Sequence, residues 1–369
     1  MTLYFLLIVI ILLVSLIPLK KNQNNIVLII SMWCLFLVMA LKAPSVGRDI
    51  EGYQHMYNLM QFASWSNYDL SWMEGGYEFL MMVFTHIFHA SFQTFLACIY
   101  AFVYFSYFCF FKRYSKDYTT TLLLYICFTF FTFDTSAIRN MIGLAICLFA
   151  IPVAEKKGFL NFLIFTGITL LATQFHKSAY IFFAVYFIIK IPFSSYSSLI
   201  YIGAPAALFL LRNSLYSFIN NHLKTVEETN IAIGGNLLMY ILCLVFCFFV
   251  WILYDRKIEH QEQTLSSSTK HAELNALSTN YFSTSGLAMR MIYTGIILQL
   301  FGSGTVLTRM AQYMQFFILI LIPNNLARFT PRTRFFIKCI LYTLLILYFW
   351  KYSLLENALD IVPYKFFWS

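Results

Sequence analysis

Residues 91–111, SFQTFLACIYAFVYFSYFCFF, contain no charged side chain, and Lys112 and Arg113 follow directly. About 20 apolar residues are enough for an α-helix to cross a bilayer. The whole chain of 369 residues has the same character, since 60% of it is apolar, 11% is charged and the mean hydropathy is +0.72. A soluble domain carries about 25% charged residues because its surface faces water. The composition excludes a soluble enzyme, a secreted disulfide scaffold and a disordered chain. It predicts an all-α polytopic integral membrane protein, with one helical domain over 1–369.

Eleven further apolar runs accompany residues 91–111. They are 3–19, 26–41, 119–133, 137–154, 159–173, 179–191, 199–211, 237–254, 286–301, 305–322 and 335–350. Several are shorter than the ~20 residues of a full span, so their helices must extend into polar flanks. The sequence therefore predicts about twelve transmembrane helices. Lys20 and Lys21 follow the first run, which is the reverse of a cleavable signal peptide and predicts an outside N-terminus.

Residues 77–89 are apolar but short, and they include Glu78 and two histidines. If they crossed the membrane, the basic residues after 111 would lie outside. We therefore predict an interfacial or re-entrant helix on the outer face. With this topology the inside segments hold 16 of the 25 basic residues but 6 of the 16 acidic ones. Basic residues favour cytoplasmic loops, so the net charge of +9 reports topology and requires no nucleic-acid partner.

Four non-membrane segments remain in this topology. They are an outer loop at 44–76, an outer loop at 212–236, an inner loop at 255–285 and an outer tail at 351–369. The inner loop has a serine run and mixed charges, which predicts a flexible cytoplasmic tether. All eight cysteines fall inside apolar runs without a histidine or carboxylate at ligand spacing, so no metal site is expected.

Polar residues gather on the predicted outer side, although they come from distant parts of the chain. They are Arg48, Asp49, Glu78, Arg139, His176, Lys177 and Arg309, with Tyr313 one helical turn after Arg309. Arg139 follows Asp134-Thr135-Ser136, which predicts a helix N-cap. Each residue also has a structural explanation, such as snorkelling of an arginine to the headgroups or a carboxylate favoured by a helix dipole. Because charges at membrane depth are costly, the set predicts an outward-facing site for an anionic, membrane-embedded ligand.

Several short motifs resemble the EpsG family. Residues 48–53 (RDIEGY) and 74–78 (EGGYE) resemble its opening motifs. Residues 137–140 (AIRN), 155–157 (EKK) and 174–178 (QFHKS) resemble its central block. Arg309, Tyr313 and residues 362–364 (VPY) fit its closing region. The resemblance covers 47–190 well and 300–369 more loosely, and the inner loop at 255–285 is not part of the pattern.

This family is similar in role to Wzy polymerases of surface polysaccharides. The resemblance implies an enzyme of the bacterial cytoplasmic membrane with its active site facing the periplasm, and a GT-C-like helical fold is one expectation. Such an enzyme transfers a growing glycan from undecaprenyl diphosphate to a fresh undecaprenyl-diphosphate-linked unit. The implied partners are these donor and acceptor lipids, the bilayer and a chain-length regulator protein, with no cofactor and no metal.

This reaction needs cations for the leaving diphosphate and a base for the acceptor hydroxyl. Arginine binds phosphate through a planar fork, so we assign the diphosphate to Arg139 and Arg309, helped by Arg48, Lys177 and Tyr313. The base is His176, Asp49 or Glu78, and the sequence leaves this choice open. A free imidazole has a pKa of about 6.5, which suits such a role. A lipid-linked oligosaccharide flippase and an O-antigen ligase-like glycosyltransferase are the alternative functions.

Overall fold

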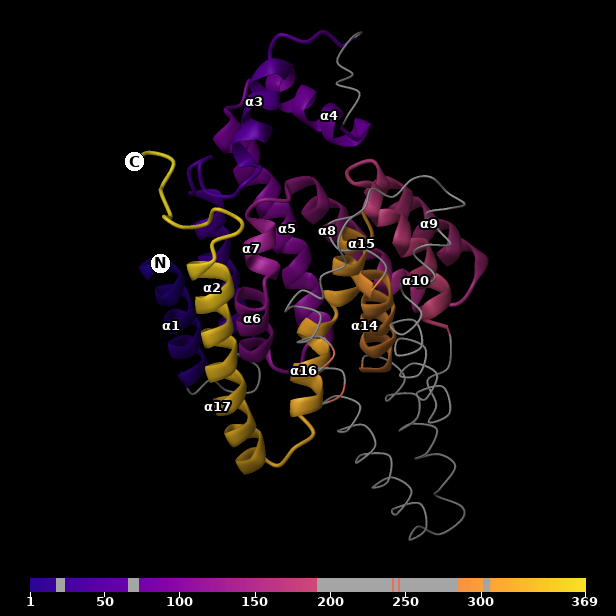
Figure 1. The fold of residues 1–369 in the computed structure, drawn as a ribbon. Coiled ribbons are helices and arrows are strands. Elements are labelled where there is room, and N and C mark those ends of the chain that lie inside the picture. Colours follow the sequence, from indigo (N-terminus) through magenta and orange to yellow (C-terminus); the bar gives the residue numbers. More distant parts are fainter. Residues whose placement is uncertain (18–23, 66–72, 191–240, 242–244, 246–284, 301–305) are drawn as a thin grey trace. The chain divides into compact units, whose positions relative to one another are not determined.

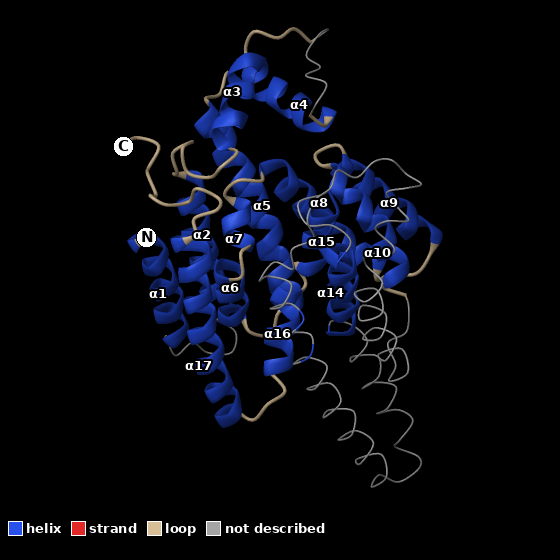
Figure 2. Ribbon diagram, in the orientation of Figure 1, coloured by secondary structure: helices blue, strands red, loops and turns tan. Residues whose placement is uncertain are grey.

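A computed structural model describes residues 1–17, 24–65, 73–190, 241, 245, 285–300 and 306–369 (Figure 1). These residues form helices and connecting loops without a β-strand, which confirms the all-α prediction for them (Figure 2). The predicted spans 199–211 and 237–254 and the predicted loops 212–236 and 255–285 lie outside the described residues, apart from 241, 245 and 285. Contacts divide the chain into unit 1, Met1–Tyr180 with Thr330–Ser369, and unit 2, Ile181–Phe329. The single domain over 1–369 stays a prediction.

Unit 1 contains most of the described helices. They are α1 Thr2–Leu16, α2 Asn24–Ala40, α3 Ile50–Met60, α4 Gly75–Met82, α5 Phe92–Tyr114, α6 Tyr118–Cys127, α7 Phe130–Asp134, α8 Ile138–Ala154, α9 Phe159–Thr173 and α17 Pro331–Tyr348. Turns of π-helix extend α4 over Val83–Ile87 and α17 over Phe349–Leu355. Local chemistry sets the ends of α5, because the Ser91 side chain accepts the Thr94 N–H and Lys112 and Arg113 lie in its last turn.

Among the residues that the structure describes, two helical stretches are long and apolar enough to cross a membrane, namely Phe92–Tyr114 and Pro331–Leu355. Shorter apolar helices, including α1, α2, α8 and α9, accompany them. The surface of α17 is largely uncovered by protein, and its Phe335, Ile340 and Leu344 are more than half exposed. An apolar helix face of this kind suits lipid better than water. The fold therefore fits a membrane protein, whereas the count of twelve spans and the orientation in the bilayer stay predictions.

Helices α2 and α5 pack side by side, and the end of one lies beside the start of the other (Figure 1). The Gln93 side chain donates to the carbonyl oxygen of Ala40 at 2.5 Å. The chain therefore leaves α2 and enters α5 at the same end of unit 1, and α3 and α4 lie between these two points in the sequence. This geometry is compatible with a segment 77–89 that does not cross, although its depth in a membrane stays a prediction.

Buried polar contacts fix the turn that precedes Arg139. The hydroxyls of Tyr107 and Tyr125 donate to Asp134 Oδ2 at 3.1 and 2.8 Å. The buried Lys42 amine donates to the carbonyl oxygen of Thr135 at 2.5 Å. The predicted N-cap at Asp134-Thr135-Ser136 is wrong, because α8 is capped by Ala137 without a side-chain hydrogen bond. The Asp134 carboxylate is instead buried in the core, where the two tyrosine hydroxyls satisfy it by hydrogen bonds.

The C-terminal tail folds back along the chain segment that follows α2. The backbone N–H groups of Ala43 and Gly47 donate to the carbonyl oxygens of Lys365 and Asp360 at 2.8 and 3.0 Å. The Tyr4 hydroxyl donates to the carbonyl oxygen of Ile361 at 2.8 Å. The two termini and the segment before α3 are therefore held together at one end of unit 1.

Unit 2 has four described helices, α10 Phe182–Ile188, α14 Ser285–Leu300, α15 Val306–Gln315 and α16 Ile318–Leu326. Helices α14 and α15 pack closely at Gly295. A Cβ at this position would lie 2.9 Å from the Gln315 side chain and 3.0 Å from the carbonyl oxygen of Ala311, so glycine permits the approach. Tyr313 is fully buried, with its ring 6.1 Å from that of Phe182, whereas Arg309 is exposed. The two residues are thus one turn apart in sequence but differ in their surroundings.

Candidate functional site

Arg139 and Glu74 form the centre of a polar cluster in unit 1. Glu74 caps the start of α4, and Arg139 lies in the first turn of α8. Arg139 Nη1 lies 2.5 Å from Glu74 Oε2, and the two side chains are 15% and 10% exposed. Water is mostly excluded from this ion pair, so removing either partner would leave the other charge poorly compensated. The site is therefore built around an arginine that a carboxylate already holds.

Glu74 also joins α4 to the turn after α9. Its Oε1 accepts the backbone N–H of Lys177 at 3.1 Å. Two residues later, the Gly76 N–H donates to the carbonyl oxygen of Gln174 at 2.9 Å. A Cβ on Gly76 would lie 2.7 Å from that same oxygen, so the approach requires glycine. One carboxylate thereby links the start of α8 to the segment that carries His176.

The neighbouring glycines offer a matched test of this close approach. Gly76→Ala should lower activity by at least about tenfold, because the added Cβ must push α4 and Glu74 away from Gln174 and a 1 Å displacement in a site is costly. Gly75→Ala should be neutral, since nothing lies within 4 Å of a Cβ at that position. The activity of membranes that contain equal amounts of each protein measures both variants. Equal activity of the two would contradict a functional approach of α4 to Gln174.

Two tyrosines line the other side of Arg139. Its Nε lies 3.4 Å from the Tyr53 hydroxyl, and its guanidinium carbon is 5.8 Å from the centre of the Tyr53 ring. The Tyr77 ring packs edge-on against that of Tyr53. Tyr77 is fully buried, and its hydroxyl has no hydrogen-bond partner among the described residues. Burial raises the pKa of Tyr77 well above its usual value, so this hydroxyl remains a donor for an incoming oxygen.

His176 is buried beside this cluster. Its Nδ1 accepts the backbone N–H of Ser178 at 3.1 Å. In the neutral ring this hydrogen bond places the proton on Nε2, so the second nitrogen is a donor rather than a base. The side chain of Lys177, the next residue, is exposed.

The other residues predicted from the sequence have separate surroundings. Glu78 is buried on α4, one turn after Glu74, whereas Asp49 is exposed at the start of α3. Arg48 Nε lies 3.9 Å from Asp360 Oδ2 in the C-terminal tail, and both side chains are mostly exposed. Such a surface pair contributes little stability. Arg309 and Tyr313 belong to unit 2, so their place in the same site stays a prediction.

Sequence reasoning missed the roles of Glu74 and Tyr53. Both stand in the motifs at 48–53 and 74–78, and a carboxylate directly before two glycines is the available signal for a close backbone approach. Among the described residues, no group of three or more His, Cys, Asp or Glu side chains is placed to hold a metal ion. The cluster is instead an arrangement of cation, carboxylate, hydroxyl and imidazole groups, which suits the binding of anions and the transfer of protons.

No curated protein and no solved structure matches the chain. The model of the EpsG family, a family of exopolysaccharide polymerase-like proteins, matches residues 25–366 and so includes every residue of the cluster. The chain belongs to the EpsG family.

Proposed function

We propose that this protein is a Wzy-type polymerase that joins undecaprenyl-diphosphate-linked oligosaccharide units into a surface polysaccharide. The observation that carries the proposal is the largely buried Arg139–Glu74 ion pair, whose carboxylate also accepts the Lys177 N–H. An anionic ligand can replace Glu74 as the partner of Arg139, and the freed Glu74 carboxylate then lies next to the bound substrate. Family membership supports a polymerase-like role for a site with this chemistry.

In this proposal Arg139 binds the diphosphate of the donor. Its guanidinium is planar and permanently charged, so it can pair two phosphate oxygens at once and stabilise the negative charge that grows as the bond to the sugar breaks. Tyr53 orients the guanidinium through its ring and hydroxyl, and Tyr77 donates to a phosphate oxygen. Lys177 and Arg48 are proposed to support the same diphosphate.

The acceptor hydroxyl attacks the anomeric carbon of the donor sugar. A new carbon–oxygen bond forms, the bond to the diphosphate breaks, and the hydroxyl proton passes to a base. We propose Glu74 as that base. When the diphosphate binds Arg139, the Glu74 carboxylate is released from its ion pair and stays at the reaction centre. Glu78 and Asp49 are the rival carboxylates. The Nδ1 contact of His176 favours a donor role for this ring, which would orient a sugar or a phosphate oxygen.

We further propose that the reaction takes place on the outer face of the bacterial cytoplasmic membrane. The basic bias of the predicted inner loops supports this orientation. Both substrates then reach the site from the outer leaflet, and a chain-length regulator is an expected partner.

A deletion strain tests the function directly. Loss of the gene should leave surface glycans that carry a single repeat unit, and the gene on a plasmid should restore the long chains. The measurement is the electrophoretic profile of the surface glycans. Absence of every surface unit would contradict a polymerase and indicate a flippase. Full-length glycan that accumulates on undecaprenyl diphosphate would indicate a ligase.

A further inference from the structure

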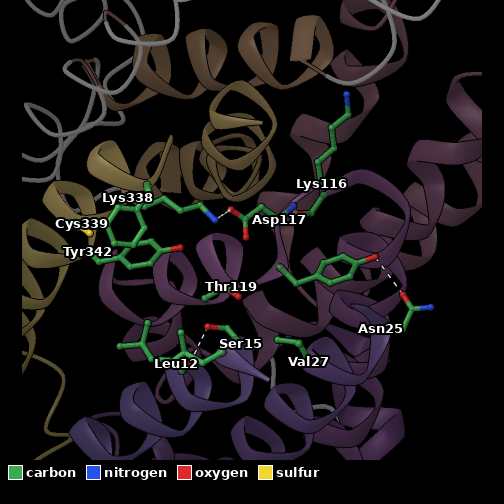
Figure 3. Close-up of a pocket in the computed structure, with 14 residues that line it drawn as sticks. Leu12, Ser15, Asn25, Val27, Lys116, Asp117, Thr119, Lys338, Cys339 and Tyr342 are labelled. Carbon is green, nitrogen blue, oxygen red and sulfur yellow. Dashed lines mark hydrogen bonds and ion pairs between the residues drawn. The ribbon is translucent and has the colours of Figure 1, made fainter. Parts of the chain in front are cut away.

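Unit 1 contains a cavity of about 930 Å³ that is separate from the Arg139 cluster (Figure 3). It lies between the end of α1, the start of α2, the α5–α6 turn and the first turns of α17. By the predicted topology this end of the unit faces the cytoplasm. Its volume is in the range of about 300–1,000 Å³ that small-molecule sites occupy. The cavity is therefore large enough for a ligand that the proposed polymerase reaction does not involve.

One wall of this cavity is charged and rich in hydroxyl groups. Lys338 Nζ reaches from α17 to Asp117 Oδ2 at 2.5 Å, and the two side chains are 25% and 15% exposed (Figure 3). Thr120 Oγ1 lies 2.7 Å from the same Asp117 oxygen and 2.7 Å from the Tyr342 hydroxyl. Ser15 also lines this cavity. The wall thus presents a cation and an anion together, with hydroxyl groups beside them.

A second wall is apolar and continues onto the lipid-suited surface of the unit. Leu12 and Leu16 of α1 and Phe335 of α17 line the cavity. Leu16 and Phe335 are 76% and 64% exposed, and Leu13 and Phe336 beside them are also more than half exposed. A ligand with a charged head and apolar chains would match both walls at once.

A structural role explains the ion pair but not the space beside it. Asp117 caps α6 by accepting the Thr120 N–H, and its contact with Lys338 holds α17 against α6. Helices α1 and α17 both pack on α6, however, and leave this volume open between them. The space opens to the surface of the unit, where an ion pair and exposed apolar side chains border it together, so its lining suits an amphipathic ligand.

We propose that the cavity binds the headgroup of an amine-bearing phospholipid of the inner leaflet. In this arrangement the lipid ammonium pairs with Asp117 and the lipid phosphate pairs with Lys338. Each charge of the zwitterionic headgroup therefore has a partner of opposite charge. The Tyr342 hydroxyl lies beside the phosphate, and the acyl chains follow the apolar faces of α1 and α17. Lys116 and Lys338 both line the cavity and attract the phosphate of any phospholipid, whereas the Asp117 carboxylate is the group in this lining that can pair with an ammonium. Asp117 is therefore the residue that distinguishes lipids.

Lipid binding by the full-length protein in detergent tests this proposal. Native mass spectrometry should show that phosphatidylethanolamine binds about fivefold more tightly than phosphatidylglycerol, the preference expected from one partly exposed ion pair. Asp117→Asn should abolish the preference while folding is preserved, because asparagine also caps helices well. Lys338→Gln should weaken both lipids about equally, since both carry a phosphate.

Arg332→Gln is the matched control, because it removes a basic residue from the same helix without lining the cavity. It should leave the preference unchanged. Equal binding of the two lipids by the unchanged protein would overturn the proposal, and so would a preference that survives in Asp117→Asn. The proposal does not depend on polymerase activity, so the glycan profile of a deletion strain leaves it unaffected.

Discussion

Glu74→Gln should lower the rate of polymerisation by about 10²- to 10⁴-fold, the usual cost of removing a general base. Glutamine has nearly the same size and can still accept the Lys177 N–H through its amide oxygen, so the turn after α9 keeps its contact. It cannot take a proton from the acceptor hydroxyl, and it no longer forms an ion pair with Arg139. The expected product is a lipid-linked glycan with a single repeat unit at normal protein level.

The measurement is the length distribution of lipid-linked glycan made by membranes with equal amounts of each protein. Glu51→Gln is the matched control, because Glu51 is exposed on α3 and should not affect chain length. Asp49→Asn, Glu78→Gln and His176→Ala are measured in parallel, since each tests a rival for the base. If Glu74→Gln still makes long chains, Glu74 is not the base. The base is then the residue whose replacement prevents chain extension.

A structural role for Glu74 predicts a different result from a catalytic one. In Glu74→Ala the space of the carboxylate is empty, so added formate can enter and accept the proton. Partial recovery of chain length with formate would support the base, because free formate is not attached to α4 and cannot hold it to Arg139 and the Lys177 backbone. If formate does not restore chain length and both Glu74 variants are equally inactive, the role of Glu74 is to position Arg139.

The helical character of the chain could be predicted from the sequence because it depends on local composition. The apolar run at 91–111 became α5 over Phe92–Tyr114, and the run at 137–154 became α8 over Ile138–Ala154. The basic residues Lys112 and Arg113 end α5, as a C-terminal dipole favours. Such features need only neighbouring residues, so one sequence is enough to find them.

The partners within the candidate site could not be predicted in the same way. Glu74 is 65 residues from Arg139 and 103 from Lys177 in the chain, and no local pattern records which carboxylate meets which cation. Asp134 shows the opposite error, because its position before a helix predicts a cap, whereas two tyrosines from other helices use it. Arg48 likewise belongs to the motif at 48–53 but pairs with Asp360 in the tail.

Arg139→Lys should reduce polymerisation by about 10- to 100-fold, which corresponds to the loss of one or two hydrogen bonds to a charged group. Lysine keeps the positive charge and can still pair with Glu74, so we expect normal expression. It is a point charge without a fork, so it cannot hold two diphosphate oxygens or stack on the Tyr53 ring in the same way. The loss should be larger for chain extension than for binding of the donor lipid, because the fork acts mainly on the leaving diphosphate.

Arg113→Lys provides the control, because Arg113 also pairs with a glutamate in unit 1. Its Nη2 lies 3.1 Å from Glu155 Oε2, but its side chain is 53% exposed, and an exposed pair of this kind contributes about 0–1 kcal/mol. Arg113→Lys should therefore give wild-type chain lengths at equal protein level. If Arg139→Lys also gave wild-type lengths, the arginine would need only its charge, as a side chain that snorkels to lipid headgroups does. A short ladder from Arg139→Lys alone would instead show that the geometry of the guanidinium, and not the ion pair as such, is what the reaction requires.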